Sequence, residues 1–452
     1  MSAPIALLLT ACALITIFVA ATRVAGIARV FLIAQVAYWS LSYVAQPLVL
    51  LWLQPAPRYG DSIADPRLAD AGYDRAIGAV MEPVVVGLWV YAALAVGYAV
   101  WSRHRPPRTA AILGDPVFLP TMWTIYVLGT LGRLQAVATG TAGEAGEIRS
   151  ADAILLFVTG LAMIGALGII VFFRSESAVT SALVISGIAA AEFLWTVASE
   201  SKTPVMGAAL GLAVRFAISG WTRRRATLVI ALAVAGVGAF GFLQSFKTSG
   251  PEEALADAVN ANYPAAVQPF LPVLRRFDLL GAATDVYYLD GRPWLSAGEV
   301  VEKSVEALIP AQLLGHEKDI AGVMWANEVR GASVDMTDIS VSLAEGNISE
   351  SFALGGYPGV TLGAAFLLGL VVAWSRALYT RSVVLLTLGL AIVEIPILFE
   401  RGLLGSVETI GKYVQVAIAV WLVYLCVDAA MAVSRRRIEV IRSSPDYSMG
   451  AR

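Results

Sequence analysis

Residues 244–281 read QSFKTSGPEEALADAVNANYPAAVQPFLPVLRRFDLLG, and they open the longest polar stretch of this chain, which continues to Gly355. Nearly every segment before and after this stretch is apolar and long enough to cross a bilayer. Only here does the chain have room for a folded region outside the membrane. We therefore expect recognition or chemistry to be concentrated in this stretch.

The composition indicates an integral membrane protein. The 452 residues are 58% hydrophobic and only 15% charged, a balance that a polytopic membrane protein requires and a soluble core does not. Arginines gather in short loops, which is a signal of membrane topology and not of nucleic-acid binding. Cys12 and Cys426 both lie in apolar segments, so the sequence offers neither a disulfide framework nor a zinc site.

About eleven segments have the length of a membrane-spanning helix. They cover residues 4–22, 27–53, 79–101, 117–138, 152–173, 179–198, 204–221, 226–244, 356–374, 382–400 and 411–433. We expect an all-α polytopic membrane protein whose parts are the first transmembrane helices (1–244), a large extracytoplasmic loop (245–355), the last transmembrane helices (356–433) and a basic cytoplasmic tail (434–452).

The basic loops all fall on one side of the membrane under this arrangement of spans. They hold Arg103, Arg105, Arg108, Arg174, Arg223, Arg224, Arg225, Arg376, Arg381, Arg435, Arg436 and Arg437. The positive-inside rule makes that side cytoplasmic. The remaining connections are acidic or mixed in charge, so we expect the N-terminus outside and the C-terminus in the cytoplasm.

The long loop should be partly helical. Apolar residues recur at helical spacing in residues 265–280 and 297–309, and aromatic residues are scattered through the loop. A disordered tether would avoid these residues. We expect several short helices, some of them amphipathic and lying against the outer membrane surface, with turns at residues 291–293 and 315–317.

Four ionisable residues fall in the outward halves of expected spans, and such residues are expensive in a bilayer unless they serve a purpose. They are Glu82, Arg133, Glu192 and Glu394. One interpretation is a polar cavity that opens outward, in which Arg133, Glu192 and Glu394 contact a ligand. The alternative is that these side chains pair with one another and fix the helix packing.

Cations at the expected outer surface form a second group: Lys202, Arg275, Arg276 and Arg401. Arginine side chains match phosphate oxygens in bidentate geometry, so together these residues could clamp a pyrophosphate. Contacts with lipid head groups or with neighbouring carboxylates are the alternative.

Three side chains are candidate general bases: Asp278, Glu350 and His316. His316 titrates near neutrality, although a lone loop histidine is more often solvated. The sequence contains no phosphate-cradling Gly-Lys-Ser motif, no His-Glu-x-x-His helix and no Gly-x-Ser-x-Gly elbow, which argues against ATP hydrolysis, zinc proteolysis and serine-hydrolase chemistry.

The layout resembles that of the Wzy-type oligosaccharide repeat-unit (O-antigen) polymerases and the related O-antigen ligases of bacterial envelopes. The residues behind this resemblance are Ser201-Lys202-Thr203-Pro204, Arg275-Arg276-Phe277-Asp278, and Glu350 followed by Gly355-Gly356-Tyr357-Pro358-Gly359. It implies a metal-independent glycosyltransferase of the bacterial plasma (inner) membrane, with no cofactor. Its donor and acceptor would be undecaprenyl-pyrophosphate-linked oligosaccharides at the outer leaflet, and a chain-length regulator is a possible partner.

The resemblance also implies roles for the candidate residues. Arg275, Arg276, Lys202 and Arg401 would stabilise the departing pyrophosphate, and one of Asp278, Glu350 or His316 would deprotonate or orient the acceptor hydroxyl. We favour a polymerase, and two alternatives stay open. One is a ligase that transfers the glycan to another acceptor, and the other is a secondary transporter or flippase.

Overall fold

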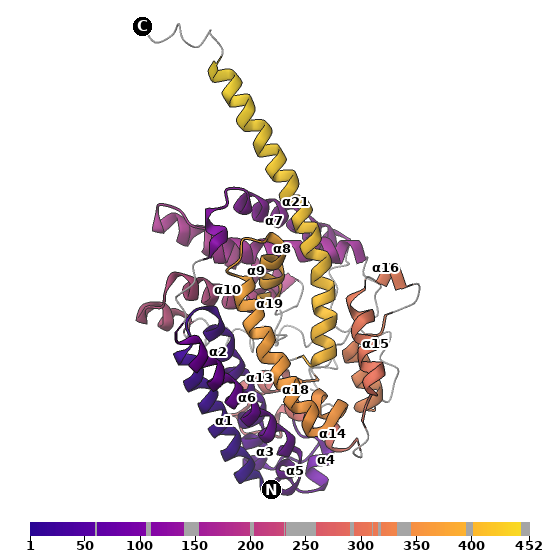
Figure 1. Ribbon diagram of the computed structural model, residues 1–452. Helices are drawn as coiled ribbons and strands as arrows, with labels where there is room; N and C mark the ends of the chain where they lie inside the picture. Colours follow the sequence, from indigo (N-terminus) through magenta and orange to yellow (C-terminus); the bar gives the residue numbers. More distant parts are fainter. Residues whose placement is uncertain are drawn as a thin grey trace.

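The computed structural model describes residues 1–58, 61–104, 110–139, 153–198, 203–229, 231, 259–289, 293–309, 311–314, 318–331, 345–394 and 401–443. All regular secondary structure in these residues is helical (Figure 1). This agrees with the expected all-α fold class, and the expected spans coincide with helices wherever the structure describes them.

The first half of the chain contains α1 (Ala3–Arg23), α2 (Ile27–Ser40), the π-helical turn η1 (Leu41–Ala45), α3 (Gln46–Leu53), α4 (Pro66–Asp70), α5 (Tyr73–Val80), α6 (Glu82–Ser102), η2 (Ala111–Gly114), α7 (Phe118–Ala138), α8 (Ala153–Phe172), α9 (Ala178–Ala198) and α10 (Thr203–Ser219). The second half contains η3 (Gln268–Phe270), α13 (Leu271–Arg276), α14 (Leu279–Tyr287), α15 (Ala297–Leu308), α16 (Ala311–Leu314), α17 (Ala321–Met324), η4 (Trp325–Val329), α18 (Asn347–Ala377), α19 (Val383–Glu394) and α21 (Leu403–Ser443).

Six helical segments among the described residues are long and apolar enough to cross a membrane. They are Ala3–Arg23, Ile27–Leu53, Glu82–Ser102, Ala178–Thr196, Asn347–Ala377 and Leu403–Arg435, and shorter apolar helices cover Phe157–Phe172, Pro204–Ser219 and Val383–Val393. The expected span at 117–138 is present as α7 but is not among the six, and its apolar run is interrupted by Arg133 and Gln135. Most of the expected span at 226–244 lies outside the described residues.

Small residues allow close packing of the helices, as at the contact of α7 with α8. A side chain at Gly129 would overlap the backbone of Ala162, and one at Gly165 would meet the backbone of Tyr126. Apolar burial alone does not drive association in a lipid solvent, so close backbone approach of this kind is a main source of helix pairing. The largest buried cluster joins residues of α1, α2, α6, α8 and α18.

The segment at 265–280 is interrupted and not one continuous helix. Pro269 and Pro272 lie in η3 and at the start of α13, and α14 begins after a break at Phe277 and Asp278. The expected helix at 297–309 is present as α15, which begins with a capping box between Ser296 and Glu299. Most of the expected turn at 291–293 and the whole turn at 315–317 lie outside the described residues.

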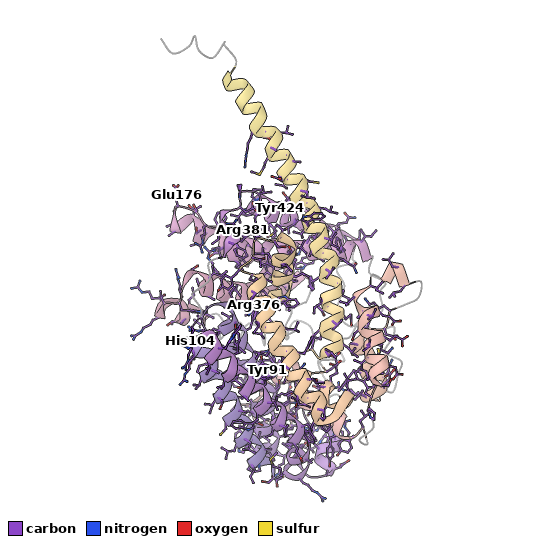
Figure 2. The ribbon with its side chains drawn as sticks, in the orientation of Figure 1. Tyr91, His104, Glu176, Arg376, Arg381 and Tyr424 are labelled. Carbon is purple, nitrogen blue, oxygen red and sulfur yellow. The ribbon has the colours of Figure 1, made fainter. Side chains whose placement is uncertain are left out.

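Residues in and beside connections that the sequence assigns to one side of the membrane lie close together in space. Arg376 stacks on Trp101, and the Ala111 N–H donates to the Tyr379 carbonyl at 3.3 Å. Figure 2 shows Arg376, Arg381 and His104 away from the start of α1, which lies at the bottom of the view. The connection between α3 and α5, which contains α4, meets the long loop at α14, where Arg67 pairs with Asp285.

Candidate functional site

The beginning of α18 is a buried polar turn. Asn347, Ser349, Glu350 and Ser351 are all buried, although this part of the helix precedes the apolar run. The helix is broken at Gly356, whose φ of +58° lies in the left-handed region that glycine adopts without strain. The break separates the polar turn from the apolar remainder of α18 and lets the two run in different directions.

Glu350 binds the N-terminus of α21. Its carboxylate accepts hydrogen bonds from the backbone N–H groups of Leu403 and Leu404, the latter at 3.1 Å. These N–H groups have no partner within their own helix, and the positive end of the helix dipole favours an anion there. Glu350 therefore ties the start of α18 to the start of α21.

Arg401 lies at the same place and faces a second buried carboxylate, Glu345. Its Nη1 is 3.7 Å from Glu345 Oε1. The Glu345 side chain is fully buried, and that of Arg401 is 24% exposed. Burial raises the pKa of Glu345 to about 7, although Arg401 opposes the shift. We call Glu345, Glu350 and Arg401 the carboxylate–arginine centre.

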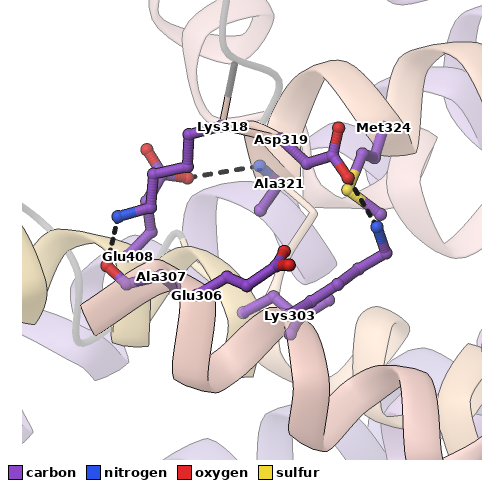
Figure 3. A pocket seen from close by; sticks show the side chains of 9 residues that line it. Lys303, Glu306, Ala307, Lys318, Asp319, Ala321, Met324 and Glu408 are labelled. Atoms are coloured by element: carbon purple, nitrogen blue, oxygen red, sulfur yellow. Dashed lines mark hydrogen bonds and ion pairs between the residues drawn. The ribbon is translucent and has the colours of Figure 1, made fainter. Parts of the chain in front are cut away.

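A small pocket lies where the first turns of α21 meet α15 and α17 (Figure 3). Leu404 lines the pocket while its backbone N–H binds Glu350, so the pocket adjoins the carboxylate–arginine centre. Lys303 pairs with Asp319 at 2.6 Å on one side of the pocket. Glu408 accepts from the Ala321 N–H at 3.2 Å and from Lys412 Nζ at 2.6 Å. Charged groups of both signs therefore line this pocket.

Asp278 lies where α14 begins. Its Oδ1 accepts from the Gly281 N–H at 2.7 Å, which caps the helix, and from Gln46 Nε2 of α3 at 3.0 Å. Burial raises the pKa of Asp278, while both hydrogen bonds oppose that shift. The start of α14 adjoins the start of α18, because a side chain at Gly346 would touch Leu279. Asp278 is thus a buried helix cap close to the polar turn of α18.

Asp285 lies about two helical turns beyond Asp278 in α14 and pairs with two arginines. Its fully buried carboxylate pairs with Arg67 Nη2 and with Arg330 Nε, each at 2.7 Å. Arg67 also pairs with Asp65 at 2.7 Å. We call Arg67, Asp285 and Arg330 the arginine clasp, because these residues join the connection between α3 and α5 to two parts of the long loop.

The clasp and Glu345 were not predicted from the sequence. A signal for Asp285 was available, because a lone acid in the apolar helix LLGAATDVY needs a partner when it is buried. Nothing in the sequence identified which arginines would supply that partner.

The structure describes the side chains of only two of the four residues expected to clamp a pyrophosphate, Arg275 and Arg401. Arg401 belongs to the carboxylate–arginine centre, whereas Arg275 donates from Nη2 to Asn260 Oδ1 at 3.0 Å. Lys202, His316 and the side chain of Arg276 lie outside the described part of the chain. Of the residues predicted for catalysis and pyrophosphate binding, the structure brings together Glu350 and Arg401.

Arg133 and Glu192, predicted to line a polar cavity, form a bidentate ion pair between α7 and α9. The two contacts are 2.6 and 2.9 Å long, both side chains are buried, and Trp195 stacks on the guanidinium. This geometry favours the packing interpretation for these two residues. Glu394 ends α19, and its side chain lies outside the described residues.

Near the start of α21 the structure therefore places a fully buried carboxylate, Glu345, beside a partly exposed guanidinium, Arg401. Among the described residues no group of three or more His, Cys, Asp or Glu side chains is arranged to hold a metal ion. Comparisons with protein-family models, with curated proteins and with solved structures find no match for this chain.

Proposed function

We propose that this protein is a membrane glycosyltransferase that polymerises undecaprenyl-pyrophosphate-linked oligosaccharide repeat units for surface polysaccharide synthesis. It would act at the outer leaflet of the bacterial plasma membrane. The single observation that carries the proposal is the carboxylate–arginine centre, in which Arg401 lies beside Glu345 while Glu350 binds the start of the same helix. A pyrophosphate leaving group needs cationic donors, and an acceptor hydroxyl needs a base nearby.

The proposal includes about eleven spans, with the long loop and the N-terminus outside and the C-terminus in the cytoplasm. Supporting this arrangement, the arginine clasp joins two connections that are expected outside, and Arg376, from a connection expected inside, stacks on Trp101 at the expected inner end of its span. The carboxylate–arginine centre belongs to the expected outer set, because Glu345 and Arg401 precede spans that begin outside.

The residue roles follow from the contacts. Arg401 would stabilise the departing pyrophosphate, together with Arg275, Arg276 and Lys202. Asp278 and Glu350 each accept two hydrogen bonds from the protein, which suits them to positioning. Glu345 therefore joins His316 as a candidate for accepting the hydroxyl proton, because its pKa of about 7 lies near the operating pH.

Reconstitution in liposomes with lipid-linked repeat units tests the proposal. We expect longer glycans on the lipid, formed without any ion gradient and without added metal. Transfer of the glycan to a different acceptor without lengthening would identify a ligase. Gradient-dependent movement of the lipid-linked units with no new glycosidic bond would identify a transporter or flippase and would reject the enzyme.

A further inference from the structure

Helix α15 carries an apolar stripe that is exposed in the described part of the structure. Val301, Val305 and Leu308 are 64%, 52% and 47% exposed, and their spacing places them on one face of the helix. Leu313 of α16, just beyond, is 75% exposed. Scattered apolar residues on a surface need no explanation, but a continuous stripe of them indicates an interaction surface.

The other sides of α15 have different surroundings. Glu299 and Glu302 are exposed beside the stripe and form a flank suited to water. Ala307 is buried against α21, and Lys303 lines the pocket between the two helices. Helix α15 therefore has a protein face, a charged face and an apolar face, as helices at a membrane interface do.

The contact with α21 places the apolar face beside a candidate membrane span. A side chain at Gly411 would overlap the carbonyl oxygen of Ala307 and come within 3.0 Å of Leu308 Cα. Val414 and Ile418 lie three and seven residues beyond Gly411, on the same side of α21, and are exposed. They belong to a segment long and apolar enough to cross a membrane. The stripe of α15 thus joins the exposed apolar face of α21.

The two helices run in the same direction. Lys303 shares the pocket with Leu404, whereas Ala307 and Leu308 reach Gly411, which is further along α21. Figure 1 shows α15 beside the first part of α21, with α16 beyond the far end of α15. Lys318 holds this end, because its Nζ donates to the Ala307 and Ile309 carbonyls. Residues late in α15 therefore lie deeper along α21 than residues early in it.

We propose that the C-terminal half of α15, together with α16, is inserted among the acyl chains of the leaflet that α21 enters near Gly411. With 12 residues α15 is about 18 Å long, too short to span the bilayer but long enough to dip into one leaflet. The acyl chains of the bilayer would then cover the apolar stripe of α15. The pocket between α15 and α21 then lies at the level of the lipid head groups. This inference is independent of the proposed glycosyl transfer.

Cysteine labelling in lipid nanodiscs tests the insertion. The background is C12A/C426A, and the single cysteines are Glu302→Cys, Val305→Cys and Leu308→Cys. With a water-soluble maleimide, we expect positions 305 and 308 to react at least about tenfold more slowly than position 302, a difference that corresponds to about 1.4 kcal/mol. The three rates should become equal after denaturation in dodecyl sulfate. Labelling at position 305 as fast as at 302 would overturn the proposal.

A second measurement separates lipid from protein as the cover. Bimane attached at position 308 or 313 should be quenched by lipids brominated on their acyl chains, and position 301 should be quenched less than position 308. Native Cys426, kept as the single cysteine in a C12A variant, is the positive control, since it is exposed on α21. Slow labelling at 305 and 308 without quenching would mean that a second copy or another protein covers the stripe, and would also overturn the proposal.

Discussion

The carboxylate of Glu350 occupies the space that a side chain on residue 402 would need, so Gly402 is what allows α18 and α21 to meet. Glu350 precedes the expected span 356–374, and Gly402 follows the expected span 382–400, so the contact joins the two ends of this pair of spans. It places Arg401, the residue just before Gly402, beside Glu345. The carboxylate–arginine centre thus depends on one missing side chain.

Gly402→Ala should disrupt this contact. The added methyl group would push Glu350 from the N–H groups of Leu403 and Leu404, and a buried carboxylate that loses its donors costs on the order of 1–3 kcal/mol or more. We expect a lower melting temperature by fluorimetry and reduced chain elongation. Gly369→Ala in α18 is the matched control, since a side chain there meets nothing within 4 Å. Equal stability of the two variants would contradict this account of Gly402.

Asp285→Asn should release the arginine clasp. The buried carboxylate neutralises two arginines, and breaking a buried ion pair costs about 3–5 kcal/mol. We expect faster hydrogen exchange in α14 and in residues 318–331, together with a lower melting temperature. Asp319→Asn is the control, because the Asp319 side chain is 57% exposed and its pair with Lys303 is worth about 1 kcal/mol or less. Unchanged exchange in α14 would show that the clasp does not hold the loop.

The pair Arg133–Glu192 can be assigned to packing or to ligand binding by a double substitution. If the pair only joins α7 to α9, R133A should be strongly destabilising, whereas R133L/E192L should recover most of the stability and activity, because apolar residues can replace a buried pair. Melting temperature and elongation rate are measured for the single and double variants. A double variant that is stable but inactive would instead place the pair in a ligand-binding cavity.

Glu345 should make stability depend on pH. Because burial raises its folded-state pKa to about 7, the neutral carboxyl is favoured in the native protein. Its contribution, on the order of 3 kcal/mol, is fully present below the unfolded pKa and is lost as pH rises towards 7. We expect the melting temperature to fall between pH 5 and pH 8 and to fall less in E345Q. An unchanged profile in E345Q would assign the pH dependence to another group, such as Asp278.

Arg401→Ala should lower the elongation rate by roughly 10²-fold if the guanidinium stabilises the leaving pyrophosphate. Arg401→Lys should restore the rate only in part, because a point charge cannot copy the planar fork of arginine. Arg381→Ala, in the connection between α18 and α19 that is expected in the cytoplasm, is the control and should elongate normally. Full activity of R401A would remove Arg401 from the site, and full rescue by lysine would indicate simple electrostatics.

Much of the fold could be predicted because its signals are local. A run of apolar residues needs about 20 positions to cross a bilayer, and each run is visible without knowing its neighbours. The capped amphipathic helix at Ala297–Leu308 was predictable for the same reason. Helix α7 shows what local signals cannot predict. Its sequence contains Arg133, but the residues around Arg133 do not indicate whether its side chain faces a partner helix or a cavity.

The candidate site was predictable only as a set of residue types. Arg401 was predicted as a cation at the expected outer surface that suits phosphate oxygens, and Glu350 as a candidate base just before an apolar span. Glu345 was missed because an acid next to a glycine in a polar stretch looks solvated, and only packing buries it. Asp278 looked like a free base, yet its position at the start of α14 makes it a helix cap.

By itself the sequence determined that this is an all-helical chain with several helices apolar enough for a membrane, because hydrophobic length and helical periodicity are properties of contiguous residues. Only the tertiary structure decided which charges meet. Asp285 binds Arg67 across 218 positions, and Glu192 binds Arg133 across 59. Such pairs are selected by the shape of the packed helices, because a buried charge must find whichever partner the fold brings within reach.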